Sequence, residues 1–295
     1  MGSSSPSIQP EFRNPETDFT PTPEPVQRPR PSWSYAPATY ALVGINCLVF
    51  LVMAARGVSV WNPTSDQLMF WGADNAGAVL IQGEWWRIVT AMFVHVGILH
   101  LATNMWCLWN LGLLAEPLMG SAGMVAVYIL TGAAGNLLST FRNWWKFYPE
   151  LMESAKKIHG LLPMDLVRNS FPAGVGASGA VFGIAGALIV LLKSHRLPVP
   201  PLELRKLRRS VMYFAAINLG IGLTISLGVV ERHTGVSIDN SAHVGGVLCG
   251  LLFAAPMVPR IGSERPIFAQ KLRVAVGMVV GILVLFGFFL AQLPR

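Results

Sequence analysis

Charged residues are scarce in this chain. Only 13% of its 295 residues are Asp, Glu, Lys or Arg, whereas 53% are hydrophobic. A soluble globular domain has a charged share of roughly a quarter, about twice as much. Apolar runs of roughly 18–20 residues recur instead, each long enough to cross about 30 Å of hydrocarbon as a helix. The composition therefore excludes an ordinary soluble protein and predicts an all-α, polytopic membrane protein.

Cysteine is also rare, and short stretches of alternating polarity are missing. The three cysteines, Cys47, Cys107 and Cys249, all lie in apolar runs. There a thiol serves as a small hydrophobic group, and we expect neither disulfides nor a metal set. The apolar runs are continuous rather than alternating, which argues against a membrane β-barrel.

The net charge of +7 does not point to nucleic acid. The basic residues concentrate between the apolar runs, where they set the orientation of a membrane protein. We therefore expect the lipid bilayer, and no nucleic acid, as a partner.

Seven apolar segments are predicted to span the membrane. They are, approximately, residues 38–55, 96–115, 119–139, 173–192, 211–230, 241–258 and 274–292. Residues 1–36 are rich in Ser, Pro, Thr and Glu and hold too little apolar surface to fold, so we expect a disordered tail. Residues 140–172 are expected to form a long connection with a helix-like stretch at Glu150–His159.

Loop charge predicts the orientation of the bundle. The connection between the fourth and fifth spans holds a single acidic residue, Glu203, and six basic ones: Lys193, Arg196, Arg205, Lys206, Arg208 and Arg209. Such a loop is expected in the cytoplasm. The tail is then cytoplasmic, and the second, fourth and sixth spans begin at the outer face of a bacterial inner or plasma membrane. The outward connection at 140–172 also carries basic residues, a mild exception to the rule.

Four polar residues are predicted near the outer ends of three spans. Ser178 lies in the motif Gly176-Ala177-Ser178-Gly179, about five residues inside the fourth span. At ~1.5 Å per residue this is roughly 7 Å below the outer end of the span. His243 is near the start of the sixth span. His100 and Asn104 are one helical turn apart on one face of the second span. Polar groups buried in lipid are costly, so those that remain usually have a function.

The chemistry of these side chains predicts acyl transfer. A serine such as Ser178 is a poor nucleophile until a base removes its proton, and His243 is the suitable base. The oxyanion that forms needs hydrogen-bond donors, which His100, the Asn104 amide and the Ser178 N–H can supply. The motif is not the Gly-x-Ser-x-Gly elbow of α/β-hydrolases, because Gly179 directly follows the serine.

Glycines explain how the two helices can approach. Gly179 and Gly183 are four residues apart on the fourth span, as are Gly246 and Gly250 on the sixth. Small residues at this spacing let helix backbones come close together in a membrane. We expect this seam to bring Ser178 and His243 together.

These residues resemble the rhomboid family of intramembrane serine proteases over roughly residues 38–258. The specific pieces are His95-x4-His100-x3-Asn104, Gly176-Ala177-Ser178-Gly179, and Ala242-His243 with Gly246 and Gly250. Trp86-Arg87 and Glu116 also resemble family positions, whereas Phe182 stands where members often have tyrosine.

The resemblance implies a rhomboid-like six-helix core at residues 37–259. Residues 260–295 would then be a cytoplasmic linker and a seventh transmembrane helix. It also implies a Ser178/His243 dyad, an oxyanion site that uses His100 and Asn104, and no metal or cofactor. The implied substrates are membrane proteins, whose transmembrane helix enters sideways and is cut near its outer end.

Several interpretations stay open from the residues themselves. His95 either supports the active-site loop or is an interfacial histidine. Asp239 could orient His243 as a third triad member, or could cap the following helix. A client-binding pseudoprotease is disfavoured because both Ser178 and His243 are present. A transporter or metal-handling protein with histidine ligands is disfavoured because no visible repeat or membrane carboxylate accompanies them.

Overall fold

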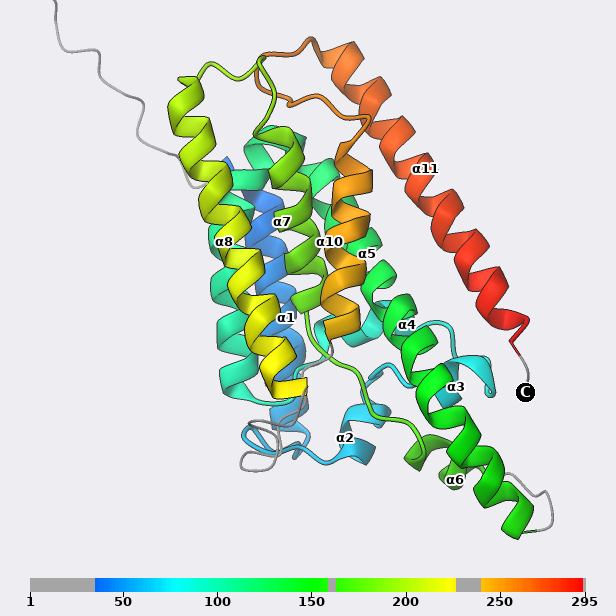
Figure 1. Cartoon of the computed structure of the whole chain (residues 1–295). Coiled ribbons are helices and arrows are strands. Elements are labelled where there is room, and N and C mark those ends of the chain that lie inside the picture. Colours follow the sequence, from blue (N-terminus) through cyan, green and yellow to red (C-terminus); the bar gives the residue numbers. More distant parts are fainter. Residues whose placement is uncertain (1–34, 159–162, 227–239, 294–295) are drawn as a thin grey trace, which may run out of the picture. The chain divides into compact units, whose positions relative to one another are not determined.

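The computed structural model describes residues 35–158, 163–226 and 240–293, in which the regular elements are helices (Figure 1). The elements are α1 (Pro37–Ala55), α2 (Ser65–Phe70), α3 (Ala76–Leu80), α4 (Arg87–Thr90), η2 (Ala91–Phe93), α5 (Ile98–Lys157), α6 (Met164–Asn169), α7 (Ser178–Leu191), α8 (Pro201–Ser226), α10 (Asn240–Ala254) and α11 (Arg265–Ala291). The predicted tail up to residue 34 and Asp239 lie outside the described residues.

The central helix is α7, which packs against α5, α8 and α10 (Figure 1). Its sequence is apolar on every side, and all residues from Gly179 to Leu188 are buried. A helix that is hydrophobic all round is one that is enclosed by other elements. The position of α7 therefore follows from its composition, and it places Ser178, the first residue of the helix, inside the bundle.

The backbones of α7 and α10 meet through glycines. A Cβ atom added to Gly246 would overlap the carbonyl oxygen of Gly179, and one added to Gly250 would overlap the carbonyl oxygen of Gly183. The two helices therefore form a seam of close backbone contact along these glycines. It is also asymmetric, because a Cβ at Gly179 would lie at an ordinary 3.4 Å from the nearest atom, the carbonyl oxygen of Ala242.

The second and third predicted spans form one long element, α5. The two halves join at Gly120, whose φ of 67° and ψ of 165° are not helical. The second half does not end near residue 139 but continues to Lys157, so the predicted 140–172 connection is helical over much of its length. Hydropathy falls after residue 139 although the backbone stays helical, because hydropathy reports lipid contact and not hydrogen bonding.

Other helix ends also differ from the predicted ones. α7 begins at Ser178 and not near 173, α8 begins at Pro201 and not near 211, and α11 begins at Arg265 and not near 274. The basic residues that begin α8 and α11 are compatible with a helix outside the hydrocarbon. Among the described residues, α1, α5 and α11 are long and apolar enough to cross a membrane, whereas α7 and α10 are shorter apolar helices.

Glu116 joins the start of α1 to the turn in α5. Its carboxylate accepts hydrogen bonds from the backbone N–H groups of Ala38 and Thr39, at 2.9 and 2.7 Å, and from the Thr39 hydroxyl. The Ser121 hydroxyl, just beyond Gly120, donates to the same carboxylate at 2.7 Å. A carboxylate satisfies the free N–H groups at a helix N-terminus and is stabilised there by the helix dipole. Glu116 thus has a structural role.

The first long connection is fixed by a buried arginine. Arg87 is 4% exposed, and its guanidinium donates to the carbonyls of Met69 and Ala73 and pairs with Glu84 at 2.6 Å. These bonds tie α4 to the turn that follows α2. The connection is therefore a packed layer rather than a simple loop.

The glycine seam makes a testable prediction about stability. Gly246→Ala and Gly250→Ala should each lower the free energy of unfolding by about 1–3 kcal/mol, because the new methyl group forces the two backbones apart. Thermal unfolding of the purified protein in detergent measures this cost. Gly281→Ala in α11 is the matched control, because a Cβ there meets no atom within 4 Å. Equal unfolding temperatures for all three variants would contradict the seam.

Candidate active site

Ser178 follows an extended segment that the first long connection holds in place. Asp74 and Gly174 form an antiparallel bridge, with hydrogen bonds of 2.8 and 2.7 Å between their backbones. Two residues later, the Gly176 N–H donates to the carbonyl of Ala91 at 2.9 Å. This segment replaces the first turn that the sequence predicted for the fourth span. Ser178 therefore begins its helix and does not lie five residues inside it.

Gly176 is required by its conformation and by its neighbour. Its φ is +115°, a value that residues with a side chain rarely adopt. A Cβ there would lie 2.5 Å from Cε1 of His100, so the imidazole of His100 packs directly on the backbone two residues before Ser178. The glycine thus lets His100 approach the serine loop.

Ser178 and His243 form a hydrogen bond. The distance between Ser178 Oγ and His243 Nε2 is 2.9 Å. His243 is in the first turn of α10 and only 8% of its surface is exposed. The predicted meeting of the two side chains is therefore present in the structure, from residues 65 positions apart in the sequence.

Phe182 holds the ring of His243. The two rings stack with centroids 4.3 Å apart and planes 23° from parallel. Phe182 lies one helical turn after Ser178 on α7, so the same helix supplies the hydroxyl and the surface on which the imidazole rests. The stacking restricts rotation of the ring and keeps Nε2 directed at Ser178.

The N-terminus of α7 supplies donors beside the serine hydroxyl. The first four N–H groups of a helix have no partner within the helix, and the dipole makes this end partly positive. Ser178 is the first residue of the 14-residue α7, so its own N–H belongs to this set. An oxyanion formed at Ser178 would lie in a favourable field.

His100 and Asn104 occupy one face of α5 near its start. Asn104 is 6% exposed, and its Nδ2 donates to the carbonyl of His100 at 2.9 Å. This bond uses one of the two amide hydrogens and leaves the other for a second acceptor. His100 thus packs on the serine loop, while the described hydrogen bond of Asn104 stays within its own helix.

His95 supports the segment that precedes Ser178. It is 1% exposed, its Nδ1 lies 3.4 Å from the carbonyl of Phe93, and the Ala177 N–H donates to its Nε2 at 3.5 Å. Burial in this connecting segment, together with the nearby His100, lowers the pKa of His95 to about 3. The ring is therefore neutral at physiological pH, with Nδ1 protonated and Nε2 free to accept. Its burial and its hydrogen bond to Ala177 favour a role in holding the active-site loop over that of an interfacial histidine.

Asp74 is a residue of the site that no sequence pattern predicts. Besides its bridge to Gly174, its carboxylate accepts a hydrogen bond from the Thr140 hydroxyl at 3.1 Å. Asp74 thereby connects the serine loop to the second half of α5. No spacing or motif marks this residue, because its partners are 66 and 100 positions away.

The histidines do not form a metal site in the part of the chain that the structure describes. The rings of His95 and His100 are 5.2 Å apart. Within residues 35–158, 163–226 and 240–293, no group of three or more His, Cys, Asp or Glu side chains is arranged to hold an ion.

Comparisons with known proteins find similar sequences among rhomboid proteases. The chain is 29% identical to the rhomboid protease GluP of Bacillus subtilis over 242 residues, which are 82% of this chain and 38% of GluP. It is 29% identical to the rhomboid protease AarA of Providencia stuartii, over 80% of this chain and 75% of AarA. It is 30% identical to the mitochondrial RHOMBOID-like protein 6 of Arabidopsis thaliana, over 69% of this chain and 54% of that protein.

The chain thus spans only part of the length of GluP and of the Arabidopsis protein. A family model, the rhomboid domain, matches residues 82–260, which include every element from α4 to α10. This match covers more than half of the chain, and the multi-pass helical architecture agrees with it. The chain belongs to the rhomboid family.

Proposed function

We propose that the protein is an intramembrane serine endopeptidase that hydrolyses peptide bonds in or near the transmembrane segments of membrane proteins. Ser178 is the nucleophile and His243 is the general base. The observation that carries this proposal is the 2.9 Å hydrogen bond between Ser178 Oγ and His243 Nε2. A nucleophile within hydrogen-bond reach of a positioned base is the arrangement that covalent acyl transfer needs.

The proposed reaction has two halves. His243 Nε2 takes the proton of Ser178 as Oγ attacks the carbonyl carbon of the scissile bond, and the carbonyl oxygen becomes an oxyanion. The intermediate collapses when the C–N bond breaks, and His243 gives the proton to the departing amine. His243 then deprotonates a water that attacks the acyl carbon. The ester C–O bond breaks, the carboxylic acid leaves, and His243 returns the proton to Ser178 Oγ.

Three donors are proposed for the oxyanion. The Ser178 N–H lies at the N-terminus of α7, His100 packs on Gly176, and Asn104 keeps a second amide hydrogen. Gly176, Gly179, Gly183, Gly246 and Gly250 support the site structurally. Proton transfer and hydrogen bonding account for each step, so we propose no metal or cofactor.

The proposed architecture is a core of six spans at residues 37–259, followed at residues 260–295 by a cytoplasmic linker and a seventh span. The core consists of α1, the two halves of α5 on either side of Gly120, α7, α8 and α10. α11 is the additional helix. Most of the predicted tail at residues 1–36 lies outside the described residues.

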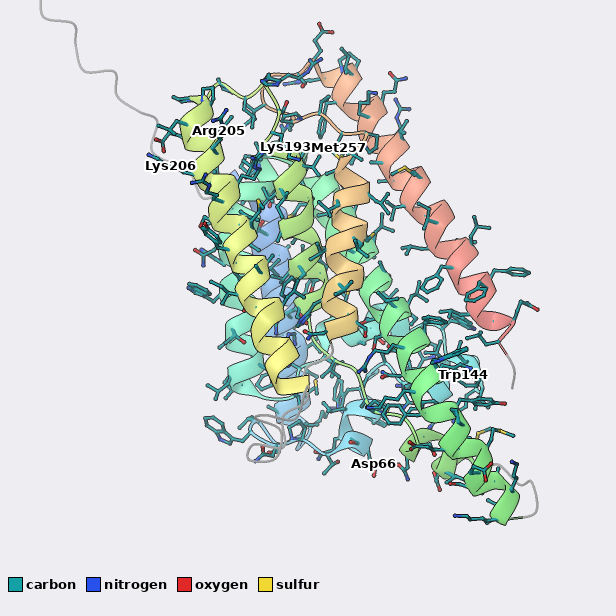
Figure 2. All side chains as sticks on the ribbon, viewed as in Figure 1. Asp66, Trp144, Lys193, Arg205, Lys206 and Met257 are labelled. Carbon is teal, nitrogen blue, oxygen red and sulfur yellow. The ribbon has the colours of Figure 1, made fainter. Side chains whose placement is uncertain are left out.

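Loop charge supports an outward-facing active site. In Figure 2, the labelled Lys193, Arg205 and Lys206 lie at the end of the bundle opposite Asp66. α7 runs from Ser178 to Leu191, next to Lys193, so about 20 Å of helix separates the serine from the basic end. If basic loops face the cytoplasm, Ser178 opens to the outer side of a bacterial inner or plasma membrane.

The dyad predicts a sharp loss of activity in two variants. Ser178→Ala and His243→Ala should each lower cleavage of a reporter transmembrane substrate in lipid vesicles by at least about 10³-fold, because nucleophile and base act as a unit. Ser154→Ala, at a half-buried position, and His195→Ala, at an exposed one, both lie away from the site and should cleave at the rate of the unmodified protein. Retention of cleavage by either dyad variant would exclude the assignment.

The proposed oxyanion site predicts that alanine substitution of two asparagines on α5 has different effects on kcat. Asn104→Ala should lower kcat by about 10²-fold or more with little change in KM, as loss of an oxyanion donor does. Asn110→Ala is the matched control, because Asn110 donates to the carbonyl of Trp106 just as Asn104 donates to that of His100. Equal kinetic effects of the two substitutions would show that Asn104 has only a structural role within α5 and is not an oxyanion donor.

A further inference from the structure

A groove of about 480 Å³ lies between α5 and α10, at the end of the bundle where Ser178 is found. We call it the α5–α10 groove. Its lining residues are Leu138, Phe141, Arg142, Trp145, Lys146, Asn240, Ser241 and Val244. Neither the serine nor the histidine of the candidate active site lines it, although Ser241 and Val244 flank His243 on α10.

The α5 wall of the groove is a single helix face with graded polarity. Its residues follow the spacing i, i+3, i+4, i+7 and i+8, which places them in one row. The row begins with Leu138 and Phe141 and ends with Trp145 and Lys146, about 12 Å further along the axis at 1.5 Å per residue. It is therefore apolar toward the middle of the bundle and cationic toward its end.

The cations of the groove lack a carboxylate partner. Arg142 and Lys146 are exposed, and neither forms an ion pair with a described residue. The Lys146 ammonium lies 4.8 Å from the ring of Phe147, a contact that leaves its hydrogens available. Glu150, one turn beyond Lys146, is exposed and does not line the groove. The groove thus has two unpaired positive charges next to an apolar lining.

We propose that the α5–α10 groove binds one anionic phospholipid. One acyl chain lies along Leu138, Phe141 and Val244, and the phosphate is held by Arg142 and Lys146. Trp145 is 74% exposed and sits between the two cations in the row. Tryptophan favours the level of lipid headgroups, which is the level that the phosphate occupies.

The charges select a lipid rather than a transmembrane helix of a partner protein. An apolar helix seated in the groove would cover two cations and supply no anion, and an unpaired charge away from water is costly. A phospholipid offers both an anionic phosphate for the two cations and an apolar chain for the apolar residues. Basic residues at this end of the bundle are also contrary to the loop-charge rule, and a lipid ligand gives Arg142 and Lys146 a reason to be there.

Native mass spectrometry of the full-length chain tests the site. The protein in detergent is mixed with palmitoyl-oleoyl phosphatidylglycerol or with phosphatidylcholine that carries the same chains. We expect one retained phosphatidylglycerol, preferred over phosphatidylcholine. In Arg142→Ala/Lys146→Ala the affinity for phosphatidylglycerol should fall roughly thirty-fold, which is about 1 kcal/mol for each cation at 1.4 kcal/mol per tenfold.

The matched control is Lys156→Ala/Lys157→Ala, at the exposed end of the same helix and with the same change in net charge. It should retain the lipid as the unmodified protein does. Equal loss in both double variants, equal retention in both, or equal binding of the two lipids would each overturn the proposal. All variants are first compared by thermal unfolding, since exposed positions should leave the fold intact.

A photoreactive residue at position 145 identifies the occupant in vesicles that contain phosphatidylglycerol. A lipid adduct supports the site. A protein adduct without lipid would assign the groove to a partner helix and contradict the proposal.

Discussion

The close approach of the α7 and α10 backbones sets the distance between Ser178 and His243. Gly246 and Gly250 face the carbonyls of Gly179 and Gly183, with no room for a Cβ atom. On its other side α10 meets α5, where Gly245 lies against the carbonyl of Ala134 and a Cβ would be 2.9 Å away. α10 is thus held between two helices by its small residues. These contacts therefore fix the position of the His243 imidazole in the first turn of α10.

The serine depends on a second constraint of a different kind. Ser178 opens its helix because the residues before it are extended, and backbone hydrogen bonds to Asp74 and Ala91 keep them extended. At the first residue of a helix, free backbone N–H groups lie next to the side chain, where an oxyanion would form. A serine deeper in the helix would have no such N–H groups beside it. The packed first connection, held by Arg87, and the buried His95 therefore contribute to the site from outside the central helices.

Much of this arrangement could be predicted from the sequence, because the relevant signals are local. Glycines four residues apart beside Ser178 and near His243 indicated the seam and the meeting of the two side chains. The stacking of Phe182 on His243 follows from its place one turn after the serine. The buried role of Glu116 could also be inferred, since a carboxylate at a helix turn needs donors.

The rest could not be predicted for physical reasons. The bridge between Asp74 and Gly174 joins backbone groups, which any residue carries, so no side chain marks it. Helix ends in and beyond the lipid were misplaced because hydropathy records the solvent of a residue and not its backbone hydrogen bonds. The extension of α5 to Lys157 is stabilised instead by packing, including the stack of Trp144 on Tyr148 and Phe171.

The most direct test of the pairing is to map where a serine-directed fluorophosphonate reacts. Such a reagent modifies a hydroxyl only when a base activates it. Peptide mass spectrometry of the labelled full-length protein should find the adduct on Ser178, and it should disappear when His243 is replaced by alanine. An adduct on a different serine, or one on Ser178 that forms equally fast without the imidazole, would contradict the account.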